Sequence, residues 1–304
     1  MCRERAILIA GPTASGKSAL ALALARNCAG TIINADSMQV YRELRILTAR
    51  PDPPDEAGVP HALYGHVSGA EAYSVGRWLG EVEETLVETE RSGRTAIIVG
   101  GTGLYFKALL EGLSPVAPIP PAIRARWRAV GAARTGPELH RMLGERDPVM
   151  AKRLSPGDRQ RMVRALEVID ATGYSLAHWQ GRPGTPVLRD DQVVKIVIAP
   201  ERGVLYERCD RRFGEMIEAG ALGEVLTLRE LGIDPGRPIM RALGVRPLLA
   251  HAAGEINLQD AIAAAGIETR RYAKRQLTWL RRHMKCWEWR QAWELRGSGV
   301  GRGA

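Results

Sequence analysis

The residues most able to do chemistry lie in one eight-residue loop near the N-terminus. They read Gly11-Pro12-Thr13-Ala14-Ser15-Gly16-Lys17-Ser18, between an apolar run at 6–10 and an alanine- and leucine-rich run at 19–25. A strand, a Gly-x-x-x-x-Gly-Lys-Ser turn and a helix in this order are the context of a phosphate-binding P-loop. Backbone N–H groups and the helix N-terminus attract an anion, Lys17 adds a full charge, and the Ser18 hydroxyl can ligate Mg²⁺. The sequence therefore predicts a di- or triphosphate site.

A second candidate group follows the next predicted strand, at 31–35. Asp36 comes directly after this strand and begins the polar turn Asp36-Ser37-Met38-Gln39. Ligands of parallel sheets bind at the carboxyl ends of the strands, so we expect Asp36 to face the P-loop. The alternative, that Asp36 is the N-cap of a following helix, is equally consistent with the residues alone.

A third loop follows the strand predicted at 95–99. It reads Gly100-Gly101-Thr102-Gly103 and carries no carboxylate. P-loop enzymes that hydrolyse ATP or transfer its phosphate usually hold Mg²⁺ with an aspartate at this point. The sequence therefore disfavours ATP chemistry and predicts that this loop converges with the other two on one crevice.

Length and composition fit a folded, enzyme-sized chain, because 304 residues with 45% hydrophobic content can bury a sizeable core. We expect an α/β fold, a P-loop NTPase-like parallel sheet flanked by helices, with a helical insertion domain. Proline- and glycine-rich segments at 114–121 and 181–186 break the chain. The predicted divisions are 1–119, the first part of the P-loop core; 120–182, the helical insertion; and 183–304, which completes the core and ends with a basic helix.

Three further segments have predicted structures. Residues 51–60 are polar and proline-rich and are predicted to form a surface loop, whereas 73–91 are predicted to be helical. The β-branched run at 192–199 is expected to return to the first sheet as a strand.

Cysteine and histidine usage argues against a zinc site or a disulfide framework. Cys2, Cys28, Cys209 and Cys286 show no Cys-x-x-Cys spacing, and the six histidines add no ligand-spaced pair. The apolar run at 6–10 is too short for an export signal, and no segment approaches a membrane span. We therefore expect a cytoplasmic, monomeric protein without membrane contact.

Positive charge is concentrated in the later part of the chain. Residues 1–115 hold 11 Lys/Arg and 13 Asp/Glu, a net of −2, whereas 116–304 hold 32 and 21, a net of +11. An uneven basic surface is typical of proteins that bind nucleic acid.

One predicted helix, at 268–285, carries much of this charge. On a helical wheel, seven basic residues fall within an arc of roughly 140°: Arg270, Arg271, Lys274, Arg275, Arg281, Arg282 and Lys285. We call this set the basic stripe. An ordinary solvated helix face is the alternative, but such a face usually includes acidic residues, and none follows Glu268 in this helix.

Several short motifs follow one another along nearly the whole chain. They are GPTASGKS at 11–18, DSMQVY at 36–41, TARP at 48–51, GGTGLY at 100–105, LLEGL at 109–113, DRQR at 158–161, RALE at 164–167, RALG at 241–244 and AKRQLTW at 273–279. Together, and in this order, they resemble the bacterial tRNA dimethylallyltransferase (tRNA isopentenyltransferase) family. The chain departs from the family pattern at Val245, where an aromatic residue is frequent, and between 63 and 69.

The resemblance implies that the P-loop binds the diphosphate of dimethylallyl diphosphate. The allylic group would go to the exocyclic amine of the adenosine 3′-adjacent to the anticodon, in tRNAs that read codons starting with U. Asp36 is the candidate general base, because this amine must lose a proton as it bonds to carbon. Lys17, Mg²⁺ on Ser18 and, by resemblance, Arg241 would stabilise the leaving diphosphate. Thr102 matches a family threonine near the reacting centre.

The expected macromolecular partner is the anticodon stem-loop of tRNA. Contacts with it are assigned partly by resemblance and partly from the basic stripe, to Asp36, Ser37, Met38, Gln39, Thr102, Arg124, Gln160, Arg161, Met162, Val163, Arg164, Arg241, Arg246, Arg271, Arg275 and Arg282.

Three other functions compete with this interpretation. An ATP-dependent kinase of a small metabolite would share the P-loop and the sheet, and a prenyltransferase acting on free adenine nucleotides would share the donor. Both leave the basic stripe without a role. A non-catalytic, nucleotide-gated RNA-binding protein would use the stripe but would require no particular chemistry of Asp36.

Overall fold

The structure, a computed structural model, describes residues 5–291. Its strands are β1 (Ala6–Ala10), β2 (Gly30–Asn34), β3 (His61–Ala62), β4 (Thr95–Gly100), β5 (Val193–Ile198) and β6 (Glu288–Arg290). They form one sheet in the order β3-β2-β4-β1-β5-β6, and each neighbouring pair is parallel. The predicted parallel sheet is confirmed, and so is the return of 192–199 beside β1.

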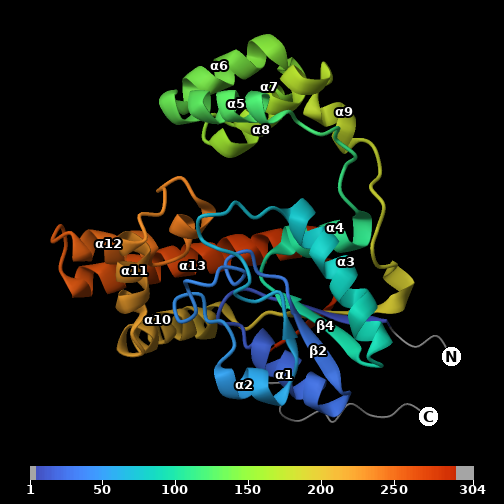
Figure 1. The fold of residues 1–304 in the computed structure, drawn as a ribbon, viewed down its shortest axis with the longest axis vertical. Helices are drawn as coiled ribbons and strands as arrows, with labels where there is room; N and C mark the ends of the chain where they lie inside the picture. Colours follow the sequence, from blue (N-terminus) through green and yellow to red (C-terminus); the bar gives the residue numbers. More distant parts are fainter. Residues whose placement is uncertain (1–4, 292–304) are drawn as a thin grey trace. The chain divides into compact units, whose positions relative to one another are not determined.

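Helices cover both faces of this sheet (Figure 1). The helices before the insertion are α1 (Lys17–Asn27), α2 (Pro53–Gly58), α3 (Val75–Arg91) and α4 (Gly103–Glu111). On one face, Ile9 and Ile97 pack with Ala21 and Ala25 of α1. On the other, Leu8 and Ile98 pack with α3, α4 and the end of the last helix, through Trp78, Phe106 and Leu280. Burial on both faces explains why the strands are continuously apolar.

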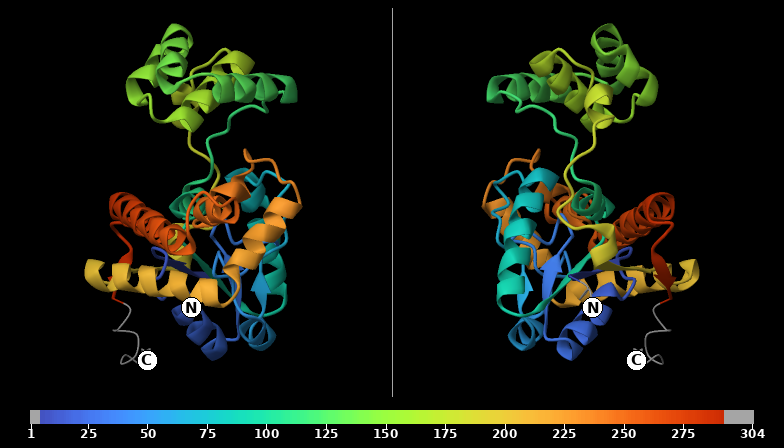
Figure 2. Two further views of the ribbon diagram at one scale, coloured as in Figure 1. Left: turned by 90° about the vertical axis from the view of Figure 1, so that its left-hand side faces the viewer. Right: turned by 90° about the vertical axis from the view of Figure 1, so that its right-hand side faces the viewer.

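A second group of helices follows β5. It consists of α10 (Arg202–Glu218), α11 (Ala221–Glu230), α12 (Val245–Ala252) and α13 (Leu258–His283), with the short 3₁₀ turn η2 (Pro238–Arg241) between α11 and α12. Another 3₁₀ turn, η1 (Asp190–Gln192), comes directly before β5. Figure 2 shows α10 running beside α13. Phe213, Leu248 and Ala265 from this group bury Val40 and Leu44, which lie just after the predicted Asp36 turn. The group therefore fixes the loop that leaves β2.

The chain divides into two compact units, residues 111–186 and the remainder. The 111–186 unit contains α5 (Pro121–Ala133), α6 (Gly136–Arg146), α7 (Pro148–Arg153), α8 (Arg159–Thr172) and α9 (Leu176–Gln180). Its own core includes Trp127, Leu139, Met162 and Leu166.

The predicted insertion, 120–182, lies inside this unit, and the structure extends the unit by several residues at each end. The two flanking segments run side by side, because a Cβ on Gly112 would lie 2.4 Å from Thr185 N, and one on Gly184 would lie 2.6 Å from Leu113 N. This close backbone contact places both flanks in the same unit.

Short elements are the main difference from the sequence-based expectation. The segment 51–60, predicted as a surface loop, contains α2, which has proline in its first turn, where the missing N–H costs nothing. Strands β3 and β6 have two and three residues, too few to show a period in the sequence. Within residues 5–291, no helix is both long enough and apolar enough to cross a membrane.

Candidate active site

The P-loop curls at the end of β1 through two residues in the left-handed region. Ala14 has φ 62° and Gly16 has φ 93°, and α1 begins at Lys17. Position 11 requires glycine, because a Cβ there would lie only 2.7 Å from the backbone oxygen of Ile198. Alternation of right- and left-handed residues turns backbone N–H groups toward one side, which is how such loops bind anions.

Two helices from the far end of the chain contact the P-loop at Thr13. Gln276 of α13 accepts a hydrogen bond from Thr13 N at 2.9 Å and donates one to Gly101 O at 2.9 Å. Arg212 of α10 donates to the Thr13 hydroxyl. Gln276 is buried, and Trp279, one turn further along α13, packs where a Cβ on Gly103 would lie.

Sequence reasoning missed the roles of Gln276 and Arg212. Gln276 lies in one of the family-like motifs, but the sequence assigns it no function. The family resemblance points to Arg241, and not Arg212, as a cation that stabilises the diphosphate. These contacts join residues 263 and 199 positions apart, so no local pattern in the sequence indicates them. The tandem Arg211-Arg212 in an otherwise amphipathic segment was the available signal.

Asp36 is held by a network at the end of β2. The fully buried Asn34 accepts the Asp36 N–H at 2.8 Å and donates to the Asp36 carbonyl at 2.9 Å, while Trp78 Nε1 donates to the Asn34 carbonyl at 2.8 Å. The Asp36 carboxylate accepts the Met38 N–H at 2.9 Å. Residues 36–39 form turns, so the N-cap interpretation of Asp36 is wrong. The carboxylate instead closes an Asx-type turn.

The loop after β4 lies directly against the Asp36 turn. Gly100 permits this, since a Cβ there would lie 2.0 Å from Ala35 O. Thr102 N donates to Ala35 O at 3.2 Å, and the Thr102 hydroxyl accepts the Ser37 N–H at 3.0 Å. Gly11 N donates in turn to Gly100 O at 3.3 Å. The predicted convergence of the three loops is confirmed.

Charges are crowded in this crevice. Burial lowers the pKa of the Lys17 ammonium to about 8, the Asp36 carboxylate opposes that shift, and Arg212 adds to it. Burial also lowers the pKa of the Arg212 guanidinium. Two cations therefore lie in a desolvated position beside one carboxylate. An anion bound in the P-loop would favour the protonated form of Lys17.

Burial, with the Asp36 carboxylate as the next cause, raises the pKa of three tyrosine hydroxyls, those of Tyr64, Tyr105 and Tyr272. These hydroxyls stay neutral at ordinary pH and can donate hydrogen bonds.

Binding of an organic diphosphate in the P-loop should depend on pH through Lys17. Above pH 8 the free protein loses this proton, whereas the complex retains it, so binding takes up a proton. We expect the affinity to be flat below pH 8 and to weaken by up to about tenfold per pH unit above it. Isothermal titration calorimetry across this range measures the effect.

The Lys17→Arg variant is the matched control for this pH dependence, because a guanidinium stays charged throughout the range. Its affinity should show no fall above pH 8, whatever its absolute value. An equally steep fall in both proteins would assign the titration to another group.

Metal binding by the chain alone is limited. In the part of the chain that the structure describes, no group of three or more His, Cys, Asp or Glu side chains could hold a metal ion. Cys28, Cys209 and Cys286 are free thiols, and Cys2 lies outside the described residues. Ser18 is exposed in the first turn of α1. Mg²⁺ fits such a position, because it commonly takes one or two protein ligands together with substrate phosphates and waters.

Other predicted residues near the β2 loop have structural contacts. The Gln39 side chain donates to Thr48 O at 2.9 Å and to Ala49 O at 2.8 Å, so it holds the following loop together. Arg241 is exposed at the end of η2, and Arg246 is exposed on α12.

The basic stripe lies on one side of α13 and just beyond it. Six of its members are exposed, namely Arg271, Lys274, Arg275, Arg281, Arg282 and Lys285. Arg270 is the exception, because it is half-buried and forms an ion pair with Asp210 of α10. Lys285 follows the last residue of the helix, His283. The opposite side of α13 carries the buried Gln276 and Leu280.

The predicted RNA contacts in the 111–186 unit fall into two groups. Arg124 on α5 and Gln160 and Arg161 on α8 are exposed. Met162 is fully buried in the core of the unit and Val163 packs against that core, so these two side chains stabilise the unit, and their contact with tRNA stays a prediction. Their apolar character follows the helical period of α8, which sequence reasoning did not separate from the basic residues around them.

Arg164, also on α8, is half-buried and pairs with Glu167 at 3.2 Å. Among the predicted contacts on α8, Gln160 and Arg161 are therefore the exposed ones.

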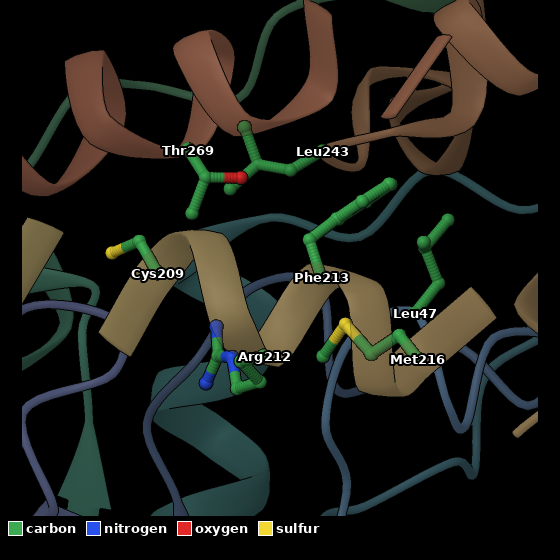
Figure 3. Close-up of a pocket in the computed structure, with 7 residues that line it drawn as sticks. All are labelled: Leu47, Cys209, Arg212, Phe213, Met216, Leu243 and Thr269. Carbon is green, nitrogen blue, oxygen red and sulfur yellow. The ribbon is translucent and has the colours of Figure 1, made fainter. Parts of the chain in front are cut away.

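A small pocket between α10 and α13 is distinct from the crevice (Figure 3). Its lining residues are Leu47, Cys209, Arg212, Phe213, Met216, Leu243 and Thr269, and its volume is ≈ 20 Å³. That space suits about one water molecule. Figure 3 shows Arg212 pointing away from Leu243 and Thr269, consistent with its contact with the P-loop.

Lys17 of the P-loop faces Asp36, and the neighbouring parallel strand β4 ends without a carboxylate. This arrangement defines a transferase-type site for a diphosphate-bearing substrate. The family described as IPP transferase matches residues 39–283, and that described as isopentenyl transferase matches residues 4–59. The chain belongs to the IPP transferase family.

Individual relatives agree with this assignment. The tRNA dimethylallyltransferases of Parvibaculum lavamentivorans and Chelativorans sp. are each 52% identical to the chain, covering 93% and 92% of it and 90% and 96% of their own length. The full-length tRNA isopentenylpyrophosphate transferase of Bacillus halodurans superimposes with a TM-score of 0.68 at 32% identity, covering 95% of this chain and 90% of that one. A eukaryotic dimethylallyltransferase acting on tRNA gives 0.81 at 27% identity, covering 96% and 75%.

Proposed function

We propose that the chain transfers a dimethylallyl group from dimethylallyl diphosphate to tRNA and releases diphosphate. The acceptor is the exocyclic amine of the adenosine 3′-adjacent to the anticodon, in tRNAs that read codons starting with U. The observation that carries the proposal is the meeting of three loops at one sheet edge, with Lys17, Asp36 and Thr102 on them. Membership of the IPP transferase family supports it.

The reaction forms one bond and breaks another. The adenine amine attacks the allylic carbon, the C–O bond to diphosphate breaks, and its electron pair leaves on the diphosphate. The amine proton goes to the Asp36 carboxylate, a role worth about 10²–10⁴ in rate. Lys17 and Arg212 lie where negative charge grows on the leaving group and stabilise it there.

Three other residues complete the proposed site. Thr102 holds the Asp36 turn through Ser37 and is proposed, by resemblance, to lie near the reacting centre. Ser18 is the proposed protein ligand of Mg²⁺, which when bound adds positive charge to the diphosphate. Arg241 is proposed, from the family resemblance alone, to contact the diphosphate or tRNA.

Incubation with unmodified tRNA, dimethylallyl diphosphate and Mg²⁺ tests the function directly. Nuclease digestion to oligonucleotides and mass spectrometry should find the dimethylallyl group on an adenosine at one position only. Parallel reactions with free AMP, and with ATP in place of the donor, separate the competing functions. Modification of AMP but not tRNA, or phosphate transfer from ATP, would contradict the proposal.

The basic stripe is proposed to contact the phosphates of the anticodon stem. Replacing Arg271, Arg275 and Arg282 with Gln removes three of its six exposed charges. Each lost phosphate contact lowers the slope of log affinity against log salt by about 0.7–0.9, so we expect a slope lower by about 2–3 and weaker tRNA binding. Titration of labelled tRNA at several salt concentrations measures both.

A matched control removes the same net charge elsewhere. Arg26, Arg91 and Arg189 are exposed and lie outside α13. Changing these three to Gln should leave the salt slope unchanged. Equal effects of the two triple variants would mean that total charge, and not the stripe, attracts the tRNA.

A further inference from the structure

Three aromatic rings gather in the 111–186 unit, where α8 ends and α9 begins. Tyr174 stacks on His178 with ring centroids 5.0 Å apart and an interplanar angle of 21°. Trp179 meets both rings edge-on, at 5.7 Å from His178 and 6.4 Å from Tyr174. Arg182 places its guanidinium 5.1 Å from the centre of the Trp179 ring. We call these four residues the aromatic platform.

Three of the four platform residues are exposed, whereas Trp179 is half-buried against the core of the unit. Tyr174 is 58% exposed and is the most exposed large apolar side chain among those described, whereas its neighbour Leu176 is 8% exposed and belongs to the core. His178 and Arg182 are exposed as well. Burial of apolar surface therefore does not explain why a tyrosine stands at position 174.

The backbone under the platform is tightly held. Gly173 ends α8 in the left-handed region, with φ 72°, and so turns the chain toward Tyr174. Ser175 donates to the carboxylate of the buried Asp147 at 2.8 Å. Trp179 Nε1 donates to the Thr172 hydroxyl at 3.3 Å. Rigid support of this kind lets an exposed ring bind a partner without a large ordering cost.

The unit that carries the platform has a positive net charge. The unit of residues 111–186 holds 12 Lys/Arg and 7 Asp/Glu, a net of +5. Exposed aromatic rings next to arginine, on a basic surface, are the combination that binds unpaired nucleotides, because a base stacks on a ring while its phosphate meets a cation. A paired stem offers no free base face to such a ring.

We propose that the aromatic platform stacks an unpaired base of the tRNA substrate, with Tyr174 as the stacking ring and Arg182 as its neighbouring cation. The inference rests on the proposed function, since it takes tRNA as the bound molecule. It adds to that function a contact with unpaired nucleotides, in addition to the proposed phosphate contacts of the basic stripe.

The test compares Tyr174→Ala with Tyr174→Phe in the full chain, using an anticodon hairpin from unmodified tRNA. Loss of one base–ring stack should weaken hairpin binding by about 5- to 100-fold in the Ala variant, whereas Phe keeps the ring and should bind like the wild type. The salt slope should be unchanged in both, because stacking releases no counterions. A fluorescent adenine analogue in the hairpin loop should be quenched by the wild type and by Tyr174→Phe only.

Two further measurements separate this proposal from its competitors. Arg182→Gln should reduce the salt slope by about 0.7–0.9, in contrast to the Tyr174 variants. A fully paired RNA duplex of the same length should bind the wild type and Tyr174→Ala equally well. An unchanged hairpin affinity for Tyr174→Ala, or an equal loss with the duplex, would overturn the proposal.

Failure of the proposed function would look different. In that case the wild type would not prenylate tRNA at any concentration, whereas failure of the platform would leave prenylation intact and hairpin binding insensitive to Tyr174. Thermal unfolding of Tyr174→Ala should match the wild type, because the ring lies outside the core of its unit. A common melting temperature therefore excludes loss of fold as the cause of weak binding.

Discussion

The Asp36→Asn variant should lose about 10²-fold or more in the rate of the chemical step while binding tRNA within a few-fold of the wild type. Asparagine keeps the side-chain oxygen that accepts the Met38 N–H at 2.9 Å, so the turn survives. It cannot take the proton of the adenine amine. Single-turnover prenylation, with enzyme and donor in excess over tRNA, measures the chemical step without contributions from product release.

Asp36→Ala is the companion variant, because it removes both the base and the turn. If Asp36 acts as the base, the Asp36→Asn and Asp36→Ala variants should have similarly low rates. If Asp36 contributes to the rate only by closing the turn, Asp36→Asn should have near-wild-type activity and Asp36→Ala should not. A rate for Asp36→Asn within a few-fold of the wild type would therefore remove Asp36 from the chemistry.

The Lys17→Met variant should reduce kcat/KM for dimethylallyl diphosphate by about 10²–10³-fold at saturating tRNA, the usual cost of removing one group that stabilises developing charge. The inhibition constant of inorganic diphosphate should rise, and the KM for tRNA should change little. Steady-state kinetics with each substrate varied in turn gives these three values.

A stability measurement distinguishes this functional loss from misfolding. Burial lowers the pKa of Lys17 to about 8, so below that pH the folded protein holds the ammonium at a cost relative to the unfolded chain. Replacing it with methionine should therefore leave the melting temperature at pH 7 unchanged or higher. A large fall in melting temperature together with the loss of activity would contradict a role confined to the diphosphate.

Much of the fold and part of the site follow from the sequence because their signals are local. The P-loop spacing specifies strand, turn and helix together, and the apolar runs specify buried parallel strands. Carboxyl ends of parallel strands meet at one edge, so the loops that carry Asp36 and Thr102 are predicted beside the P-loop from their positions after apolar strands. The period of an α-helix likewise placed Arg271, Arg275 and Arg282 on one face of α13.

Only the tertiary structure decided which side chains reach across the molecule. Arg212 and Gln276 contact Thr13 from α10 and α13, Asp210 pairs with Arg270, and Met162 turns into the core of its unit. The Asp36 carboxylate closes a turn instead of capping a helix. Each of these outcomes depends on how helices distant in sequence pack together, and packing is set by the shape and burial of many side chains at once. Local spacing determined where the phosphate binds, and long-range packing determined which cations and amides surround it.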